Sequence, residues 1–277
     1  MTIAKIAAAI TVGTFMTITI GGTAQAQTSW TGPYIGGHLG EALQRRGGDE
    51  ALVFDKNLDG TFGDTVQTSA GANAFGPGFC RGVALSGTAS AGCARDDNNS
   101  FDGGLRAGYD WQTGRWVVGA LVEVSSTKLT DSATAFSTTP AAYTFTRELK
   151  GVAALRVRAG WARDNTLGYL TAGVAKANID HSFTTTNTVN TFTLIDDDKA
   201  TGYQVGGGLD VKVTEKVSLG LEYLYTSFDD DSITVRAAGP APSTNPFILT
   251  NASGTDFRRT DGDLAFSSIR LTAAYRF

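Results

Sequence analysis

Hydrophobic side chains alternate with polar or small ones over several stretches of the chain. The clearest stretches place apolar residues at every second position in 101–111, 116–124, 151–161, 203–213 and 217–225. A period of two is typical of β-strands that have one apolar face. Each stretch is about ten residues long, which is the length that a tilted strand needs to cross a bilayer. The alternative is a soluble β-sandwich, whose strands average about five or six residues.

The connections between these stretches favour the membrane interpretation. Short polar turns at 112–115, 163–166 and 214–216 alternate with long polar stretches at 43–100, 126–148, 178–199 and 227–264. Outer-membrane barrels show this asymmetry, with short periplasmic turns and long extracellular loops. Four loops and three turns join eight strands, of which the first lies near 34–43 and the last is 267–277. The predicted fold is therefore all-β: an eight-stranded antiparallel transmembrane β-barrel with long extracellular loops.

The first 26 residues are predicted to be a signal peptide. Lys5 is the only charge before residue 41, a mostly apolar stretch follows at 6–20, and Ala24-Gln25-Ala26 has the pattern of a cleavage site. A membrane helix is the alternative for 6–20, but four threonines interrupt the apolar stretch. Residues 27–277 then form one barrel domain outside the cytoplasm. The longest later apolar run, 116–122, is too short for a spanning helix of about 20 residues.

Both ends of the predicted barrel resemble a known family. The last strand carries apolar residues at alternate positions up to the terminal Phe277, which resembles the signal read by the outer-membrane assembly machinery. The segment Trp30-Thr31-Gly32-Pro33-Tyr34-Ile35-Gly36 resembles the opening of porin-like major outer-membrane proteins of alphaproteobacteria, relatives of the OmpA membrane domain. This resemblance implies an outer-membrane location, contact with lipid and lipopolysaccharide, and the assembly machinery as a partner. The first loop, at 43–100, is longer than the family pattern leads us to expect.

Five charged residues are predicted to form a belt inside the barrel. Arg106, Arg156 and Arg270 lie on the inner face of descending strands, and Glu123 and Glu222 lie on the inner face of ascending strands. All five are six to eight positions from the nearest periplasmic end, so they share one depth. An unpaired charge there would be costly, so we expect the opposite charges to pair. An ion path is one interpretation, but an eight-stranded barrel has room mainly for side chains, which favours a packed polar core.

The first loop contains a candidate calcium site. Asp55, Asn57 and Asp59 place oxygen atoms at positions 1, 3 and 5 of an EF-hand-like loop, and Gly60 occupies position 6. Position 12 is Val66 instead of glutamate, although Asp64 could supply an oxygen from another angle. Calcium is the one cofactor that the sequence suggests, with weak binding of about 0.1–1 mM. The alternative is a turn in which the Asp and Asn side chains bind their own backbone.

The first loop also holds the only two cysteines, Cys80 and Cys93. Export through the oxidising periplasm predicts a disulfide between them, and two free thiols are the alternative. Closing a loop of about 14 residues would stabilise the fold by roughly 3 kcal/mol.

Composition narrows the choice of function. The net charge of −4 argues against a nucleic-acid partner. His181 lies beside Asp180, and Asp229, Asp230 and Asp231 also lie at a strand rim. This set resembles the acidic and histidine residues of outer-membrane proteases, but those have ten strands. We therefore predict no enzymatic activity and expect a solvated rim histidine.

The predicted function is structural: an integral outer-membrane barrel that presents large surface loops. A small porin-like diffusion channel is one alternative. Loop-mediated binding to a host surface or to haem is another, although two histidines give haem little support.

Overall fold

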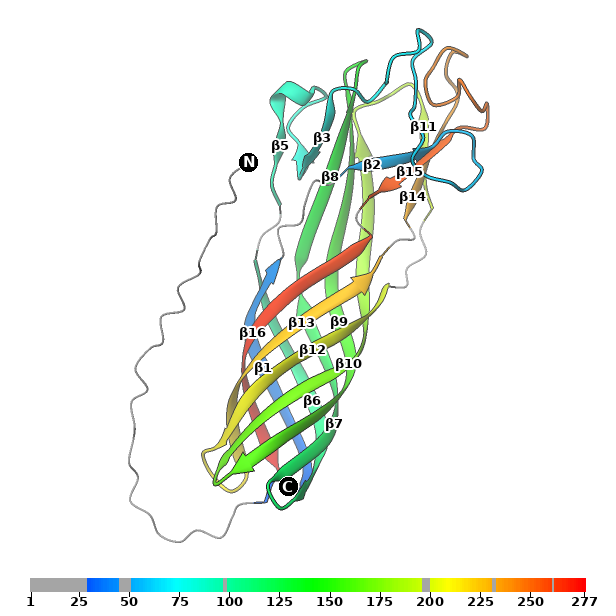
Figure 1. Cartoon of the computed structure of the whole chain (residues 1–277). Coiled ribbons are helices and arrows are strands. Elements are labelled where there is room, and N and C mark those ends of the chain that lie inside the picture. The colour runs from blue at the N-terminus through cyan, green and yellow to red at the C-terminus, as the bar shows by residue number, and fades with distance from the viewer. Residues whose placement is uncertain (1–28, 45–50, 97–98, 196–199, 231–232, 261) are drawn as a thin grey trace, which may run out of the picture.

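Eight antiparallel strands close into a barrel in the computed structural model of the chain (Figure 1). The structure describes residues 29–44, 51–96, 99–195, 200–230, 233–260 and 262–277. The barrel strands are β1 (Gly32–Gln44), β6 (Ser100–Thr113), β7 (Trp116–Thr127), β9 (Ala141–Arg163), β10 (Thr166–Thr185), β12 (Ala200–Lys212), β13 (Val217–Asp229) and β16 (Asp263–Arg276). Each pairs with the next, and β16 pairs with β1, which closes the sheet. The predicted fold class is confirmed, whereas the predicted signal peptide lies outside the described residues.

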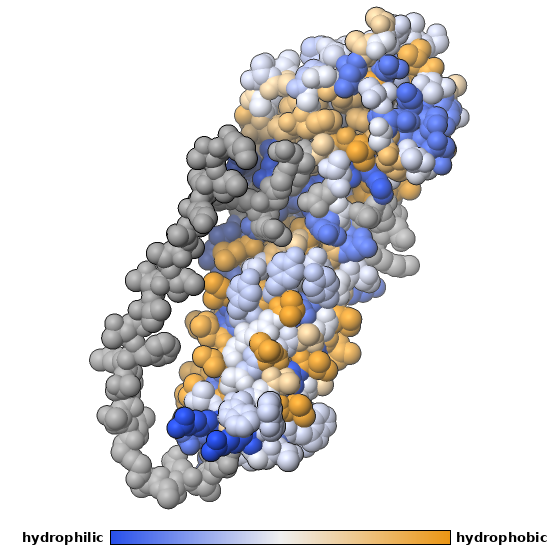
Figure 2. All heavy atoms as spheres, in the orientation of Figure 1, coloured by the Kyte–Doolittle hydropathy of each residue, from blue (hydrophilic) through white to orange (hydrophobic). Residues whose placement is uncertain are grey.

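The outer wall of the barrel is apolar. Residues of one parity point outward, such as Leu105, Leu170 and Leu271, each about 70% exposed. Orange apolar residues are therefore spread over the lower barrel in Figure 2, and blue polar residues gather at its turn end and on the opposite end. Aromatic residues form two outer girdles. Trp111, Trp116, Trp161, Tyr275 and Phe277 lie near the turn end, and Phe101, Tyr203 and Tyr225 lie nearer the loop end. Such girdles mark the two bilayer interfaces of barrel strands.

Among the described residues, the structure contains no helix with the length and apolarity needed to span a membrane.

Two barrel strands continue far beyond the apolar wall. The structure contradicts the prediction of polar loops at 126–148 and 178–199, because β9 and β10 remain paired as far as Tyr143 and Thr185. The hairpin partner of β9 is β8 (Leu129–Ser137). Backbone pairing needs no apolar outer face once a strand has left the bilayer. Polarity therefore marked where the membrane-spanning part ends but not where the strands end.

The remaining long segments form a second sheet at the loop end. Its order is β11 (Thr191–Ile195), β14 (Thr234–Ala238), β15 (Thr255–Arg259) and β2 (Leu52–Asp55). Three shorter strands, β3 (Gly78–Arg81), β4 (Val83–Ala84) and β5 (Cys93–Ala94), and the 3-10 helix η1 (Ala89–Ala91) lie against the β8–β9 extension (Figure 1). We call the described parts of 51–96, 128–150, 179–195 and 230–260 the head.

Aromatic rings form the core of the head. Phe257 is fully buried, and its ring centroid lies 5.5 to 5.9 Å from those of Phe145, Phe54 and Phe247. The same core includes Phe75 and Tyr143, and it draws on all four segments that the sequence assigned to loops. The head is therefore a packed structure with its own hydrophobic core and not a set of independent loops.

Candidate functional site

The five residues of the predicted charge belt meet inside the barrel. The Arg106 guanidinium lies 2.9 Å from Glu123 and 3.0 Å from Glu222, and that of Arg156 lies 2.6 and 3.3 Å from the same carboxylates. Arg270 contacts Glu123 at 2.8 Å and Glu222 at 3.7 Å. All five are at most 6% exposed. The strand register explains the convergence, because Arg106 is directly opposite Glu123 and Glu222 is directly opposite Arg270.

Two further residues of this layer were missed by the sequence reasoning. Asp102 accepts a hydrogen bond of 2.5 Å from Arg270 Nε and is buried. His38 Nε2 lies 3.3 Å from Asp102 and its Nδ1 lies 3.7 Å from Glu123. Asp102 has the inward parity of Arg106, four positions before it on β6, so the alternation could have revealed it. With Asp102 and the five belt residues, which we call the central network, three arginines face three carboxylates.

A second ionic layer lies between the central network and the turn end. Arg158 forms an ion pair with Asp110 and another, of 3.1 Å, with Asp210. Arg276 contacts Asp110 at 2.8 Å. Gly119 provides the room for Asp110, since a Cβ atom there would lie 2.1 Å from its carboxylate oxygen. The lumen is thus packed with paired charges at two depths.

Aromatic residues close the lumen at the turn end. Trp30 is fully buried with Val117 and Leu167, and the Arg276 guanidinium lies 4.6 Å above its ring centroid. Arg158 stacks in the same way on the ring of Tyr34, at 4.9 Å. These cation–π contacts tie the first described residues to the interior of the barrel.

Apolar residues close the lumen at the head end. Phe228, Phe266, Leu264, Leu129 and Leu149 are all at most 2% exposed and belong to one cluster above the central network. The interior therefore carries an apolar layer, two ionic layers and an aromatic layer in succession, with no residue of the central network open to solvent.

A third charged cluster joins the barrel to the head. Asp131 on β8 lies 2.7 Å from Arg147 on β9 and 2.7 Å from Arg259 on β15. Burial raises the pKa of the Asp131 carboxyl, but the two arginines outweigh this effect and hold that pKa below its usual value. The strand β15 belongs to the second sheet, so Asp131 connects the second sheet to the barrel extension.

His181 belongs to this cluster, which corrects the expectation of a solvated rim histidine. Its side chain is 4% exposed, and Nε2 lies 3.1 Å from Asp230, whose carboxylate also lies 3.5 Å from Arg147. Asp180 is 64% exposed and lies 3.5 Å from Lys150. The alternation of side chains explains this difference, since neighbours on β10 point to opposite faces.

The predicted calcium ligands form a turn. The carboxylate of Asp55 accepts hydrogen bonds from the backbone N–H groups of Leu58, Asp59 and Gly60, at 2.7 to 3.2 Å. Asn57 donates to Asp59, and Asp64 accepts from the backbone N–H of Lys56 instead of facing Asp55. Among the described residues, no three His, Cys, Asp or Glu side chains are placed to share a metal ion. These hydrogen bonds form the turn that was the alternative interpretation, and calcium binding by Asp55, Asn57 and Asp59 stays a prediction.

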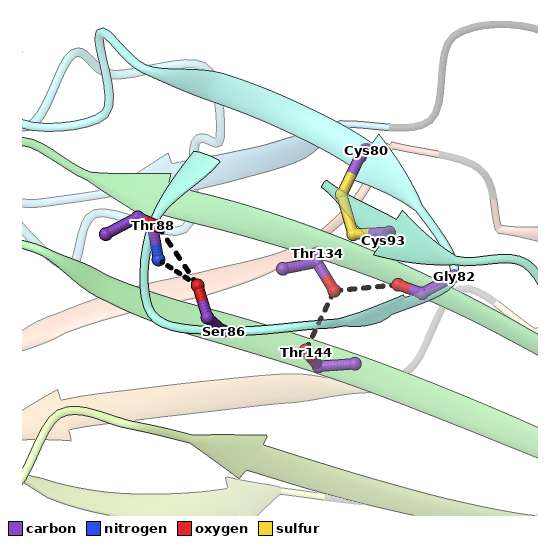
Figure 3. The surroundings of a disulfide bond; sticks show 7 residues. All are labelled: Cys80, Gly82, Ser86, Thr88, Cys93, Thr134 and Thr144. Carbon is purple, nitrogen blue, oxygen red and sulfur yellow. Dashed lines mark hydrogen bonds between the residues drawn. A yellow bond between two sulfur atoms is a disulfide. The ribbon is translucent and has the colours of Figure 1, made fainter. Parts of the chain in front are cut away.

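The cysteines are joined. A disulfide connects Cys80 on β3 to Cys93 on β5, with 6.1 Å between their Cα atoms (Figure 3). Beside it, Thr134 donates a hydrogen bond to the carbonyl of Gly82 and lies 2.8 Å from the hydroxyl of Thr144 (Figure 3). The disulfide closes the β3–β5 segment on itself, and the Thr134 bond, together with the pairing of β3 with β8, holds this segment against the barrel extension.

A comparison with protein families agrees with this architecture. The family model described as outer membrane protein beta-barrel domain matches residues 12–277. The attachment invasion locus protein Ail of Yersinia pestis is similar in structure, with 10% identity, coverage of 89% of this chain and 99% of that chain, and a TM-score of 0.29. The outer membrane protease OmpT from Escherichia coli has 9% identity, coverage of 92% and 100%, and a TM-score of 0.39. Likeness at this level assigns no function. No curated protein sequence matches this chain significantly.

Proposed function

The chain belongs to the outer membrane protein beta-barrel domain family, and from this premise we propose that it is a closed, non-enzymatic barrel that displays a rigid head on the cell surface. Its location is the bacterial outer membrane, in contact with lipid and lipopolysaccharide. The observation that carries the proposal is the central network. Three arginines and three carboxylates join opposite walls of the barrel, and all are buried.

The central network supports a closed barrel over a diffusion channel. Every guanidinium of this layer is within 4 Å of two carboxylates, so moving one out of the lumen would leave buried charges unpaired. Leaving a buried charge without its partner costs about 3–5 kcal/mol. The aromatic layer at Trp30 and the apolar layer at Phe266 add two further barriers to water.

The construction of the head supports a display role. It has an aromatic core, a four-stranded sheet and a disulfide, and Asp131 ties it to the barrel. A surface held in this way is fixed before it meets a partner, which lowers the ordering cost of binding. Haem binding has less support, because both imidazoles are buried beside carboxylates, His38 in the lumen and His181 under the head.

The last strand supports the assembly machinery as a partner. On β16, Ile269, Leu271 and Tyr275 point outward, and the terminal Phe277 is 68% exposed. These outward apolar side chains are the residues that give the last strand its resemblance to an assembly signal.

Conductance and surface labelling test the proposal together. Purified protein reconstituted in a planar bilayer should show no channel steps, with a large porin measured in parallel as the conducting control. An epitope tag inserted between Ser243 and Thr244, in an exposed turn of the head, should be detected by antibody on intact cells. Stable channel steps would overturn the closed barrel, and a tag detected only after lysis would overturn the display of the head.

A further inference from the structure

A cavity lies in the head where all four predicted loops meet. Phe75 of the first loop, Tyr143 of the second, Asn187 of the third and Phe247 of the fourth all line it. It includes the turn between β8 and β9, the part of that hairpin farthest from the barrel (Figure 1). Its volume is about 220 Å³. Because small-molecule sites are typically about 300–1,000 Å³, a cavity of this size fits only a small ligand.

The lining of this cavity carries no charged side chain. All the lining residues belong to the described part of the chain, and none is acidic, basic or histidine. Hydroxyl groups come from Thr138, Thr139 and Thr188, whose side chains form no hydrogen bond with the described residues. These hydroxyls are free to exchange water for a ligand. A charged ligand would find no opposite charge here and would lose hydration without compensation.

The apolar side of the cavity includes Pro140, Val189 and Pro246, and three packed aromatic rings lie beneath it. The ring centroids of Phe75, Tyr143 and Phe247 lie 5.4 to 5.8 Å from one another, each pair edge to face. All three residues line the cavity, although each is at most 4% exposed as a whole. The cavity thus offers one apolar side and a rim of hydroxyl groups.

Hydrogen bonds hold the amide groups of the cavity in fixed positions. Asn187 donates to the Tyr143 hydroxyl at 3.0 Å and accepts from the backbone N–H of Val189 at 2.8 Å. Asn245 donates to the side-chain oxygen Oδ1 of Asn190 at 3.0 Å and accepts from the backbone N–H of Phe247. These amide groups are therefore already ordered before a ligand binds, which lowers the entropic cost of binding.

We propose that this cavity binds one neutral sugar ring. A sugar combines hydroxyl groups, which suit the threonine rim, with an apolar C–H face, which suits the apolar side. It carries no charge, in agreement with the lining. The inference rests on the proposed display of the head, because a surface cavity meets glycans only if the head faces outward.

Calorimetric titration of the detergent-purified protein tests the proposal. The probes are D-glucose, D-galactose, D-mannose and N-acetyl-D-glucosamine, with D-glucuronate and D-galacturonate as charged counterparts. For a ligand of this size we expect a dissociation constant of roughly 1–10 mM for at least one neutral sugar. The matching uronate should bind at least about tenfold more weakly because its carboxylate has no partner in the cavity.

Two tryptophan substitutions distinguish sugar binding in the cavity from binding elsewhere on the head. Thr188→Trp places a large ring at the exposed rim of the cavity and should abolish sugar binding. Thr193→Trp makes the same change at an exposed position of β11 outside the cavity and should leave it unchanged. Protease resistance of the head verifies that both variants are folded.

The proposal is wrong if the folded wild type binds no neutral sugar at 50 mM (roughly five times the weakest expected constant), if it prefers the uronates, or if Thr188→Trp binds normally. Surface labelling of the tag at residue 243 reports separately on the display of the head.

Discussion

Arg270 and Asp102 form an ion pair of 2.5 Å across β1, the strand that lies between their own strands β16 and β6. The pair supplies the third carboxylate of the central network, which balances the three arginines. Because Arg270 also contacts Glu123, which in turn contacts Arg106 and Arg156, the pair links the β1 side of the barrel to Arg156 on β9, three strands away. The network thus connects strands across the lumen at a depth where the barrel interior has no continuous apolar core.

Removing Glu222 should destabilise the barrel. In Glu222→Ala, Arg106 and Arg156 each lose one of two carboxylates, and Tyr169 loses the acceptor of its 3.0 Å hydrogen bond. We expect a loss of about 3–5 kcal/mol in the free energy of unfolding, reduced to the extent that Glu123 compensates. Urea unfolding followed by the gel shift between boiled and unboiled protein measures it. Glu148→Ala, which removes an exposed partner of Lys150, should leave the midpoint unchanged.

Truncating Phe257 should unfold the head and spare the barrel. The ring is fully buried among the aromatic residues of the head core, and Phe257→Ala should cost about 3–5 kcal/mol. We expect rapid protease cleavage within the head, while the heat-dependent gel shift of the barrel persists. Phe79→Ala is the matched control, because Phe79 is 40% exposed in the same head and its loss should have little effect. Loss of the gel shift together with the head would show that the two parts fold as one unit.

Opening the disulfide should loosen only the β3–β5 segment. Mass spectrometry of the non-reduced protein should recover Cys80 linked to Cys93, and native protein should not react with thiol reagents. Cys93→Ser removes a constraint worth roughly 3 kcal/mol on a loop of this length. Protease cleavage between residues 81 and 92 should therefore accelerate, as it should in reduced wild type. Equal cleavage rates with and without reductant would contradict this role.

Acid should weaken the attachment of the head. The pKa of Asp131 is lowered in the folded protein because Arg147 and Arg259 outweigh the effect of burial. The stabilisation from this carboxylate is complete above the unfolded pKa of about 3.9 and is lost as the pH falls below it, through the lower folded value. Protease resistance of the head should thus be constant from about pH 7 to 5 with respect to this group and decline below about pH 4. Asp131→Asn should be less resistant at neutral pH and lose part of the acid dependence.

The alternation of residues was sufficient for the barrel and for most of its lumen. Period two assigns each side chain of a strand to the inner or the outer face, and the short turns fix which strands are neighbours. Arg106, Glu123, Arg156, Glu222 and Arg270 could therefore be placed at one depth from the sequence. The same rule applies to Asp102 and Asp110, whose inward parity on β6 went unused.

Local pattern was a poor guide outside the membrane-spanning strands. There the backbone can pair without an apolar outer face, so the polar segments at 126–148 and 178–199 conceal the extended parts of β9 and β10. The spacing of Asp55, Asn57 and Asp59 fits both a calcium loop and a turn, and the positions of Asp64 and of the backbone N–H groups became visible only in the structure.

What the sequence determined by itself is the set of features that repeat along a strand: the fold class, the strand count, the outward apolar face and the inward charges. Only the tertiary structure decided which distant segments meet. The head core, the pairing of Asp131 with Arg259 and the cavity beside Tyr143 each join segments from different loops. Strand alternation is set by the chirality of the backbone and can be read locally. Contacts between loops depend on long-range packing, for which neighbouring residues carry no signal.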